Sequence, residues 1–283
     1  MPHALRTLVA AAAVGGLALS GVMTAGAASA AASGPGARGP NSRSVDPGAG
    51  SNAISLAGLA GGRGGAARDH TFGRITAAPT STRTFAGYQT SVTAGSATSS
   101  AATFTVPALS CTTASVGISA DVGVAANNFK SDSVAGVFTG CAKGKAVYFP
   151  WLLVNGTEAN YTSTPLSAGD VINLSASVTT SGITVQVTDT TKGVSVTNTI
   201  TGAGASANAA WIGDDAWSSS TGTLLGVPNF GKLKFFNCLI DGTALQSLNP
   251  QEYQRVNHVG VVQIATGPFS PAPAAFATYY KHI

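Results

Sequence analysis

The feature that most constrains this chain is the alternation of apolar and polar residues in its second half. Every second residue is apolar in Val171–Val178, in Ile183–Val187 and in Val194–Thr197, and a further run of β-type residues covers Ala102–Val106. A period of two with many β-branched residues is typical of strands that bury one face. The pattern therefore predicts a sheet protein that begins near Phe85.

Turn residues divide these runs at short intervals. Ala168-Gly169-Asp170, Ser181-Gly182 and Lys192-Gly193 recur at about the 8 to 12 residues that separate strands in a sandwich or barrel. No segment of the folded part shows an apolar stripe with helical period, and only 9% of the residues are charged. This composition argues against a coiled coil, a helical bundle and a basic nucleic-acid binder. We predict a single all-β domain over residues 84–283.

The N-terminus has the organisation of an export signal. Arg6 supplies a positive charge, Leu8–Met23 is apolar, and Ala28-Ser29-Ala30 offers a cleavage site before Ala31. A membrane anchor is the alternative, but beyond Met23 the residues are too weakly apolar to span a bilayer. We expect residues 1–30 to be a signal peptide, and the processed protein to be secreted without a membrane segment.

Residues 31–83 are rich in Gly, Ala, Ser, Pro and Arg and contain few aromatic residues. Such a composition buries too little apolar surface to offset the loss of chain entropy, about 1 to 2 kcal/mol per residue. We expect a disordered segment that serves as a linker or as a propeptide, and the residues do not decide between the two.

The basic charge is concentrated in this leader. Residues 1–84 contain seven Arg and two acidic residues, whereas residues 85–283 contain eight basic and nine acidic residues, a net charge of −1. The formal net charge of +4 therefore gives no reason to propose a nucleic acid or a membrane surface as partner of the folded part.

Three cysteines lie in the predicted domain, and in an exported protein thiols tend to pair. Three residues allow three single bridges. We favour Cys111 with Cys141, because both follow adjacent early strands, and expect Cys238 to be a buried thiol. Neither a C-x-x-C motif nor a cluster of histidines accompanies them, so we expect no metal and no cofactor.

Catalytic motifs are scarce. The predicted domain contains only His258 and His282, and no G-x-S-x-G motif accompanies them. Most of its carboxylates stand in turn contexts. Asp214-Asp215 differs, because it follows the apolar strand residues Ala209–Ile212, although a solvated strand end is the simpler interpretation.

Several blocks of the chain occur in the order known from one protein family. They are Phe85-Ala86-Gly87-Tyr88, Phe104–Cys111, Ser115–Ile118, Thr139-Gly140-Cys141, Ala209–Ile212 with Ser218–Ser220, and Asn229–Phe235. In this order and spacing, residues 84–283 resemble the glutamic peptidases, or eqolisins. The resemblance implies a lectin-like antiparallel β-sandwich with a peptide groove, and secreted acid endopeptidases that often carry a propeptide.

In that family a Glu acts as general base on the attacking water and a Gln stabilises the tetrahedral intermediate. These roles require a carboxylate within about 3 Å of the water and an N–H donor directed at the oxyanion. The resemblance places the Gln at Phe138 and the Glu at Ala210, and a further family block loses its acid at Trp151-Leu152-Leu153. Neither phenylalanine nor alanine can perform these steps.

Asp214 does not replace the missing base, because a residue four positions along a strand from Ala210 lies about 13 Å away. We therefore expect an eqolisin-like protein without endopeptidase activity. An active secreted acid endopeptidase, with a polar group entering the site from elsewhere, remains the alternative.

Without its polar groups the groove is expected to be apolar and to suit an extracellular peptide, protein or glycan. Filling the core between the sheets is the alternative role for Phe85 and Tyr148, and a structural surface domain without a ligand is a third function class. The candidate groove residues are Phe85, Tyr88, Phe138, Tyr148, Trp151, Trp211 and Asp214.

Overall fold

The computed structural model describes residues 78–93, 98–126, 131–202, 207–270 and 274–281, all of which belong to one compact unit, Val45–Ile283. The predicted signal peptide and most of the predicted linker lie outside the described residues. Within the described part, no helix is long and apolar enough to cross a membrane.

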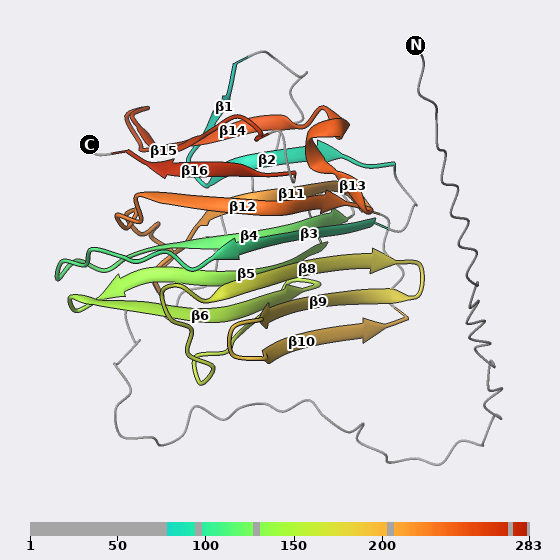
Figure 1. The fold of residues 1–283 in the computed structure, drawn as a ribbon, viewed down its shortest axis with the longest axis horizontal. Coiled ribbons are helices and arrows are strands. Elements are labelled where there is room, and N and C mark those ends of the chain that lie inside the picture. Colours follow the sequence, from blue (N-terminus) through green and yellow to red (C-terminus); the bar gives the residue numbers. More distant parts are fainter. Residues whose placement is uncertain (1–77, 94–97, 127–130, 203–206, 271–273, 282–283) are drawn as a thin grey trace, which may run out of the picture. The chain divides into compact units, whose positions relative to one another are not determined.

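Nearly all of the regular structure is β-strand (Figure 1). The one short 3₁₀ helix of the described residues is η2 (Leu245–Leu248). The strands are β1 (Thr80–Thr82), β2 (Phe85–Ser91), β3 (Thr98–Thr105), β4 (Val116–Ala126), β5 (Ser131–Ala142), β6 (Lys145–Val154), β7 (Thr157–Asn160), β8 (Val171–Thr179), β9 (Gly182–Asp189), β10 (Val194–Thr201), β11 (Ala207–Ala216), β12 (Lys232–Ile240), β13 (Thr243–Ala244), β14 (Gln251–Val256), β15 (Val262–Thr266) and β16 (Phe276–Tyr280).

The strands form one continuous sheet that curls back on itself. Its order is β10-β9-β8-β3-β12-β16-β15-β14-β2-β11-β4-β5-β6-β7, and every pairing along this path is antiparallel. Strands β8 and β9 also contact β4, β5 and β6, which stand at the other end of the path. The two ends of the sheet therefore pack face to face, which confirms the predicted all-β antiparallel sandwich.

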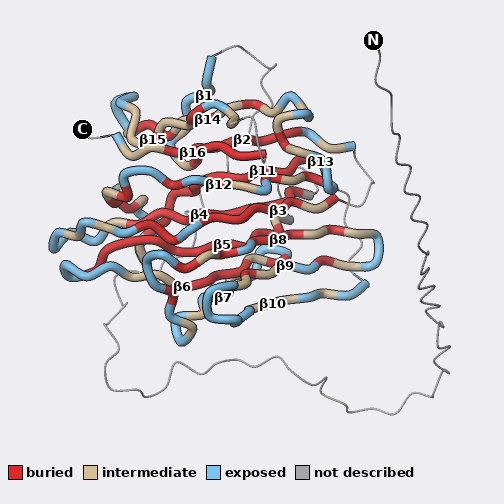
Figure 2. The backbone as a smooth tube through the Cα atoms, in the orientation of Figure 1, coloured by how far each residue is buried: buried red, intermediate tan, exposed pale blue. Residues whose placement is uncertain are grey.

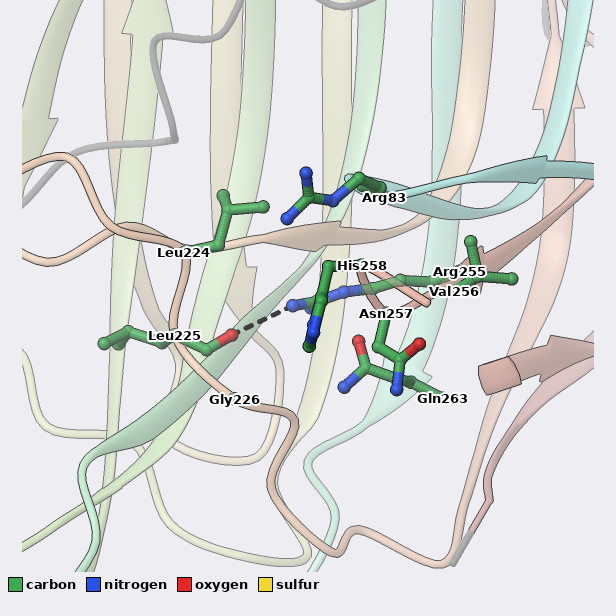
Figure 3. A pocket seen from close by; sticks show the side chains of 9 residues that line it. All are labelled: Arg83, Leu224, Leu225, Gly226, Arg255, Val256, Asn257, His258 and Gln263. Atoms are coloured by element: carbon green, nitrogen blue, oxygen red, sulfur yellow. Dashed lines mark hydrogen bonds between the residues drawn. The ribbon is translucent and has the colours of Figure 1, made fainter. Parts of the chain in front are cut away.

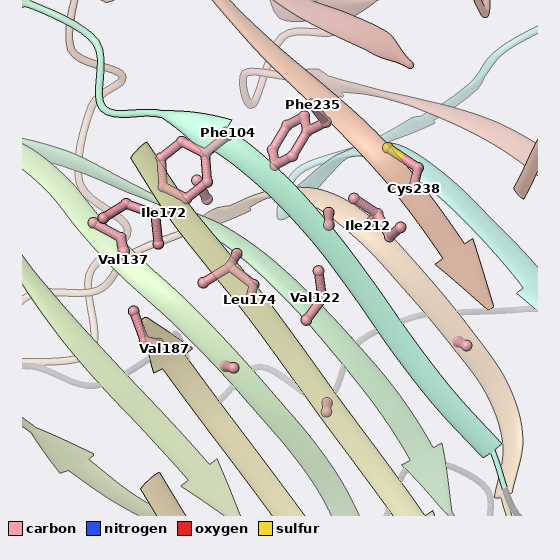
Figure 4. Packing of buried hydrophobic residues seen from close by; sticks show 14 of the residues in the cluster. Phe104, Val122, Val137, Ile172, Leu174, Val187, Ile212, Phe235 and Cys238 are labelled. Atoms are coloured by element: carbon pink, nitrogen blue, oxygen red, sulfur yellow. The ribbon is translucent and has the colours of Figure 1, made fainter. Parts of the chain in front are cut away.

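The core lies between these two layers, and its residues are among the buried ones drawn in red in Figure 2. Phe104, Ile172 and Leu174 come from one layer, and Val122 and Val137 come from the other (Figure 4). The alternation in β8 and β9 matches their burial, because Ile172, Leu174 and the other apolar residues of these strands point into the core.

The predicted start of the domain needs a small correction. Residues 80–82 belong to the segment expected to be disordered, but they form β1, which pairs in parallel with Tyr253–Arg255 of β14. The short Thr-Ser-Thr run has β-forming side chains and finds backbone partners on that strand, so composition alone placed the boundary a few residues too late.

The cysteine pairing is confirmed. A disulfide joins Cys111 to Cys141 near the end of β5, with Cα atoms 5.6 Å apart. Cys238 is free and fully buried, and burial raises the pKa of its thiol to about 12. A thiol in such surroundings stays protonated and behaves as a small apolar side chain.

Candidate functional site

Strands β2, β11, β4, β5 and β6 bury a second apolar cluster on the face opposite to the core. Because side chains alternate along a strand, one set of residues points into the sandwich and the other points to this second face. We call this second face the aromatic face and define it by its rings: Phe85, Phe138, Phe149, Trp151, Trp211, Trp217 and Tyr253.

Glycines of neighbouring strands make room for these rings. A Cβ atom on Gly123 would lie 2.0 Å from Trp211, one on Gly136 would lie 2.4 Å from Trp151, and one on Gly117 would lie 2.5 Å from Phe138. The rings therefore lie directly over the backbone of the sheet, which a side chain at these positions would prevent. The aromatic face is built by pairing a glycine on one strand with a ring on another.

Phe138 stands at the centre of this packing. Its ring stacks on Phe149 with centroids 4.8 Å apart and meets Trp217 edge-on at 5.1 Å. Trp217 also meets Trp151 at 5.4 Å. Phe138 is 0% exposed, so the position that the resemblance assigns to a polar catalytic side chain is enclosed by aromatic rings.

Two polar groups accompany the rings. The indole Nε1 of Trp151 donates a hydrogen bond to Ser119 Oγ at 2.7 Å, and that of Trp211 donates to Asp121 Oδ1 at 3.1 Å. Asp121 and Ser119 are fully buried. Asp215 stands on the same face, in register with Ser119 of β4 and Phe85 of β2.

The sequence analysis did not single out Asp121 or Trp217. For Asp121 a signal existed, because its spacing from Gly117 and Gly123 places all three on one face of a strand. Trp217 follows the last residue of β11, in a segment without periodicity, and no pattern indicated where its ring would lie.

The structure brings four of the candidate residues together on the aromatic face: Phe85, Phe138, Trp151 and Trp211. Tyr88, Tyr148 and Ala210 belong to the core between the layers instead. Tyr88 donates hydrogen bonds to the Gly267 carbonyl and to Glu252, and Tyr148 donates to the Pro107 carbonyl. These two tyrosines therefore have structural hydrogen-bond partners away from the aromatic face.

Ala210 and Phe138 lie on opposite faces of the same sheet. Across β4, Phe138 is in register with Ser119 and Asp215, whereas Ala210 is in register with Val124 and Ser133. The odd separation of these two rows along the strands places the side chains on different faces. The neighbours of Ala210 that do face the aromatic cluster are Ala209 and Trp211.

Asp214 also turns away from the aromatic face. It is fully buried and accepts a hydrogen bond from Thr278 of β16. Burial raises the pKa of its carboxyl to about 7, and the negative charge of Asp215 adds to this, while the Thr278 hydrogen bond and the Arg255 charge oppose it. The carboxyl is therefore held near the point at which it exchanges a proton at neutral pH.

The aromatic face offers limited means for chemistry. Its rings are 0 to 3% exposed, and the indole N–H groups of Trp151 and Trp211 are hydrogen-bonded within the protein. Its strands contribute the carboxylates of Asp121, Asp132 and Asp215 to this face. Among the described residues no group of three His, Cys, Asp or Glu side chains is placed to hold a metal ion.

Solved structures share this fold. A scytalido-glutamic peptidase bound to a transition state analog inhibitor is 17% identical, with 70% of this chain and 98% of that chain covered and a TM-score of 0.57. A second eqolisin, in a complex with the tripeptide Ala-Ile-His, is 17% identical with the same coverage and a TM-score of 0.56. Aspergilloglutamic peptidase from Aspergillus niger is 21% identical over 59% of this chain and 99% of that chain, with a TM-score of 0.47.

Comparison with curated protein sequences gave no match. The model of the Peptidase A4 family, in contrast, matches residues 83–265, which is most of the folded part and more than half of the chain. Sequence blocks, sandwich fold and family model agree, and the chain belongs to the Peptidase A4 family, the eqolisins or glutamic peptidases.

Proposed function

We propose that this protein is a secreted member of the family that binds extended polypeptide on the aromatic face and does not cleave it. The proposal joins the family fold with the residues that stand where the resemblance places the catalytic pair. Phe138 and Ala210 supply neither an amide donor nor a carboxylate.

The proposed loss of catalysis rests on the absence of a general base at the assigned position and at its neighbours in the chain. Because Phe138 and Ala210 face opposite sides of the sheet, an assignment shifted by one residue on either strand is the first alternative to consider. On β11 the neighbours of Ala210 are Ala209 and Trp211, and on β5 the neighbours of Phe138 are Val137 and Thr139. Thr139 and Trp211 carry hydrogen-bond donors, but none of the four is a carboxylate that acts as general base, so a shift of one residue restores no catalytic pair.

The chemistry of the face favours a peptide over a glycan. Buried apolar rings fill it, and the hydrogen-bonding side chains of its centre, Ser119 and Asp121, are already used by indole N–H groups. Sugar recognition depends on several polar groups that converge on hydroxyls, whereas apolar side chains of a peptide need only contact with rings. A glycan ligand is therefore an outcome that the binding experiment distinguishes.

Secretion is supported by the leader and by the bridge. A positive residue, an apolar stretch and an A-x-A site fit an export signal. The Cys111–Cys141 disulfide fits an oxidising compartment. Mass spectrometry of the protein recovered from the culture medium should show a chain that begins at Ala31, whereas retention of residues 1–30 would contradict processing at this site.

Tryptophan fluorescence tests the binding directly, because all three tryptophans of the chain belong to the aromatic face. We expect peptides from a peptic digest of casein to shift the emission maximum in a saturable manner, and cello-oligosaccharides to leave it unchanged. Phe138→Ala should weaken the peptide response, and Val194→Ala, at an exposed apolar residue of β10, should not. A response to the sugar alone would replace peptide by glycan, and no response to either would refute binding at this face.

A second function has one observation in its favour. Asp121 is a buried carboxylate on the same face as Phe138, so it is the described acid best placed to serve as a relocated base in an acid endopeptidase. In that case acid proteolysis would be present in the wild-type protein and absent from Asp121→Asn. Asp214, on the opposite face, is not positioned for this role, and Asp214→Asn would keep the activity.

A further inference from the structure

A cavity of about 150 Å³ opens beside the aromatic face, between β14 and the segment that follows β11 (Figure 3). Its polar lining comes from Arg83, Arg255, His258, Asn257 and Gln263. These side chains carry guanidinium, imidazole and amide N–H donors, and no carboxylate lines the cavity. The lining therefore has the donor character of a site for an anion.

Arg255 is the unusual member of this set. Its side chain is 2% exposed, and Nη2 donates to the Leu225 carbonyl at 2.9 Å. Among the described residues, Nε and Nη1 have no hydrogen-bond partner. A buried guanidinium with most of its donors unused is costly unless another group compensates its charge.

The nearby acids compensate this charge only in part. Asp214 and Asp215 interact electrostatically with Arg255 and raise its pKa, while Nε and Nη1 stay without a hydrogen-bond partner among the described residues. Burial lowers the pKa of Arg255 to about 10, which still leaves the group charged at neutral pH. Arg83 and Arg255 therefore place two positive charges at the cavity, and Asp214 and Asp215 neutralise these charges only in part. One further negative charge, on a ligand, would be stabilised there.

Exposed groups at the same cavity give a ligand direct access to donors. Arg83, between β1 and β2, and His258, after β14, are both exposed and line the cavity together with Arg255 (Figure 3). The remaining walls include the apolar side chains of Leu224 and Val256. A planar carboxylate suits the guanidinium fork, and a short apolar group suits these walls.

We propose that this cavity binds a monoanionic carboxylate attached to a short apolar group, with Arg83 and His258 as direct donors and Arg255 as the buried charge. Such a group occurs at the C-terminus of a peptide and in a free short-chain acid. Leu225 links the cavity to the aromatic face, since its side chain packs in that cluster and its carbonyl binds Arg255. A peptide bound on the face as proposed above could place its terminus here.

Calorimetric titration of the full chain tests this site with four probes: butyrate, phosphate, and one apolar pentapeptide with either a free or an amidated C-terminus. We expect the free-acid peptide to bind at least about 10-fold more tightly than the amide, as is usual for a charge-assisted hydrogen bond. Butyrate that binds as well as the peptide would identify a small-acid site, and butyrate that does not bind would identify a peptide-terminus site.

Variants separate the site from general charge. Arg83→Gln and His258→Gln alter exposed residues and should each weaken carboxylate binding about 10-fold, whereas Lys145→Gln, on the β5–β6 hairpin, should leave it unchanged. Arg255→Gln should abolish binding, with its thermal unfolding recorded to check the fold.

Four results would each overturn the proposal. They are absence of binding by both butyrate and the free-acid peptide, equal binding of the acid and the amide peptide, tighter binding of phosphate, and unchanged affinity in Arg83→Gln. Butyrate binding in a protein whose tryptophan emission ignores peptides would separate this site from the proposed function.

Discussion

At the scale of single residues, the aromatic face depends on small side chains as much as on large ones. Trp211 lies over Gly123 and Trp151 lies over Gly136, so each ring occupies the space in which a neighbouring strand lacks a Cβ atom. The indole N–H groups then reach Asp121 and Ser119, which anchors the rings. Glycine is needed at these positions so that a ring can approach the backbone of the neighbouring strand, whereas in turns it is needed because it adopts a positive φ.

Gly123→Ala should destabilise the fold by about 1 to 3 kcal/mol, the usual cost of overpacking a close-packed cluster. The added Cβ would lie 2.0 Å from Trp211, so the ring has to move. Urea unfolding measures the loss. The control is Gly226→Ala, where the nearest atom is a Val116 methyl 3.2 Å away and a smaller effect is expected. Equal effects of the two substitutions would show that ring contact is not the cause.

Asp214 should make stability depend on pH. Its folded-state pKa of about 7 lies above the ordinary 3.8, so between these values the folded protein holds a proton that the unfolded chain has released. The free energy of unfolding is therefore highest below the ordinary pKa and falls as pH rises through about 7, by a few kcal/mol at most. Thermal unfolding at acid and at weakly alkaline pH should show this fall in the wild type and a smaller one in Asp214→Asn. The same fall in both proteins would assign the effect to other groups.

At the scale of elements, the sequence predicted the positions of strands better than it predicted the face of the sheet to which each side chain points. Period two located β8 and β9, because these strands bury one face and leave the other partly exposed. It also located β10, whose residues alternate between exposed and half-buried, whereas β3 was located by its β-type residues. Strand β11 is buried on both faces, so its sequence does not show which residues point into the core. The family resemblance grouped Ala210 with Phe138, and the sequence of β11 could not show that the two face opposite sides.

The order in which the strands pair and the positions of the irregular segments could not be predicted from the sequence either. The irregular register between Phe236 and Leu239 in β12, with Asn237 at φ 53°, depends on the neighbouring strand and leaves no periodic signal. The order of the strands in the sheet and the place of Trp217 likewise depend on long-range contacts. The aromatic candidates Phe85 and Trp151 were named from the family resemblance, because their strands are buried on both faces and show no alternation.

The disulfide links elements that are close in sequence. It joins Cys111, in the segment before β4, to Cys141 in β5, at a sequence separation of 30. Cys111→Ser/Cys141→Ser should lower the free energy of unfolding by about 3 to 4 kcal/mol, because the unfolded chain regains the entropy of this loop. Denaturant unfolding gives the value, and Cys238→Ala, which keeps the bridge, should have a smaller effect. A double variant as stable as the wild type would contradict a stabilising role for the bridge.

At the scale of the whole molecule, one curled sheet presents two different buried surfaces. The inner one joins the two layers and maintains the family fold. The other is the aromatic face, which holds Phe138, whereas Ala210, the second position that the resemblance assigns to the catalytic pair, lies on the inner surface. Under the proposed function, fold and catalysis are separated in this protein, because function depends on a few side chains placed on a common architecture.

The most direct test of this separation is the digestion of acid-denatured casein by the purified protein at acid pH. Pepstatin is present to exclude aspartic peptidases, and mass spectrometry follows the fragments. We expect casein to remain intact, because the strand positions assigned to the catalytic pair offer no base and no oxyanion donor. Casein fragments that accumulate with the wild-type protein, and that disappear with Asp121→Asn, would contradict the account.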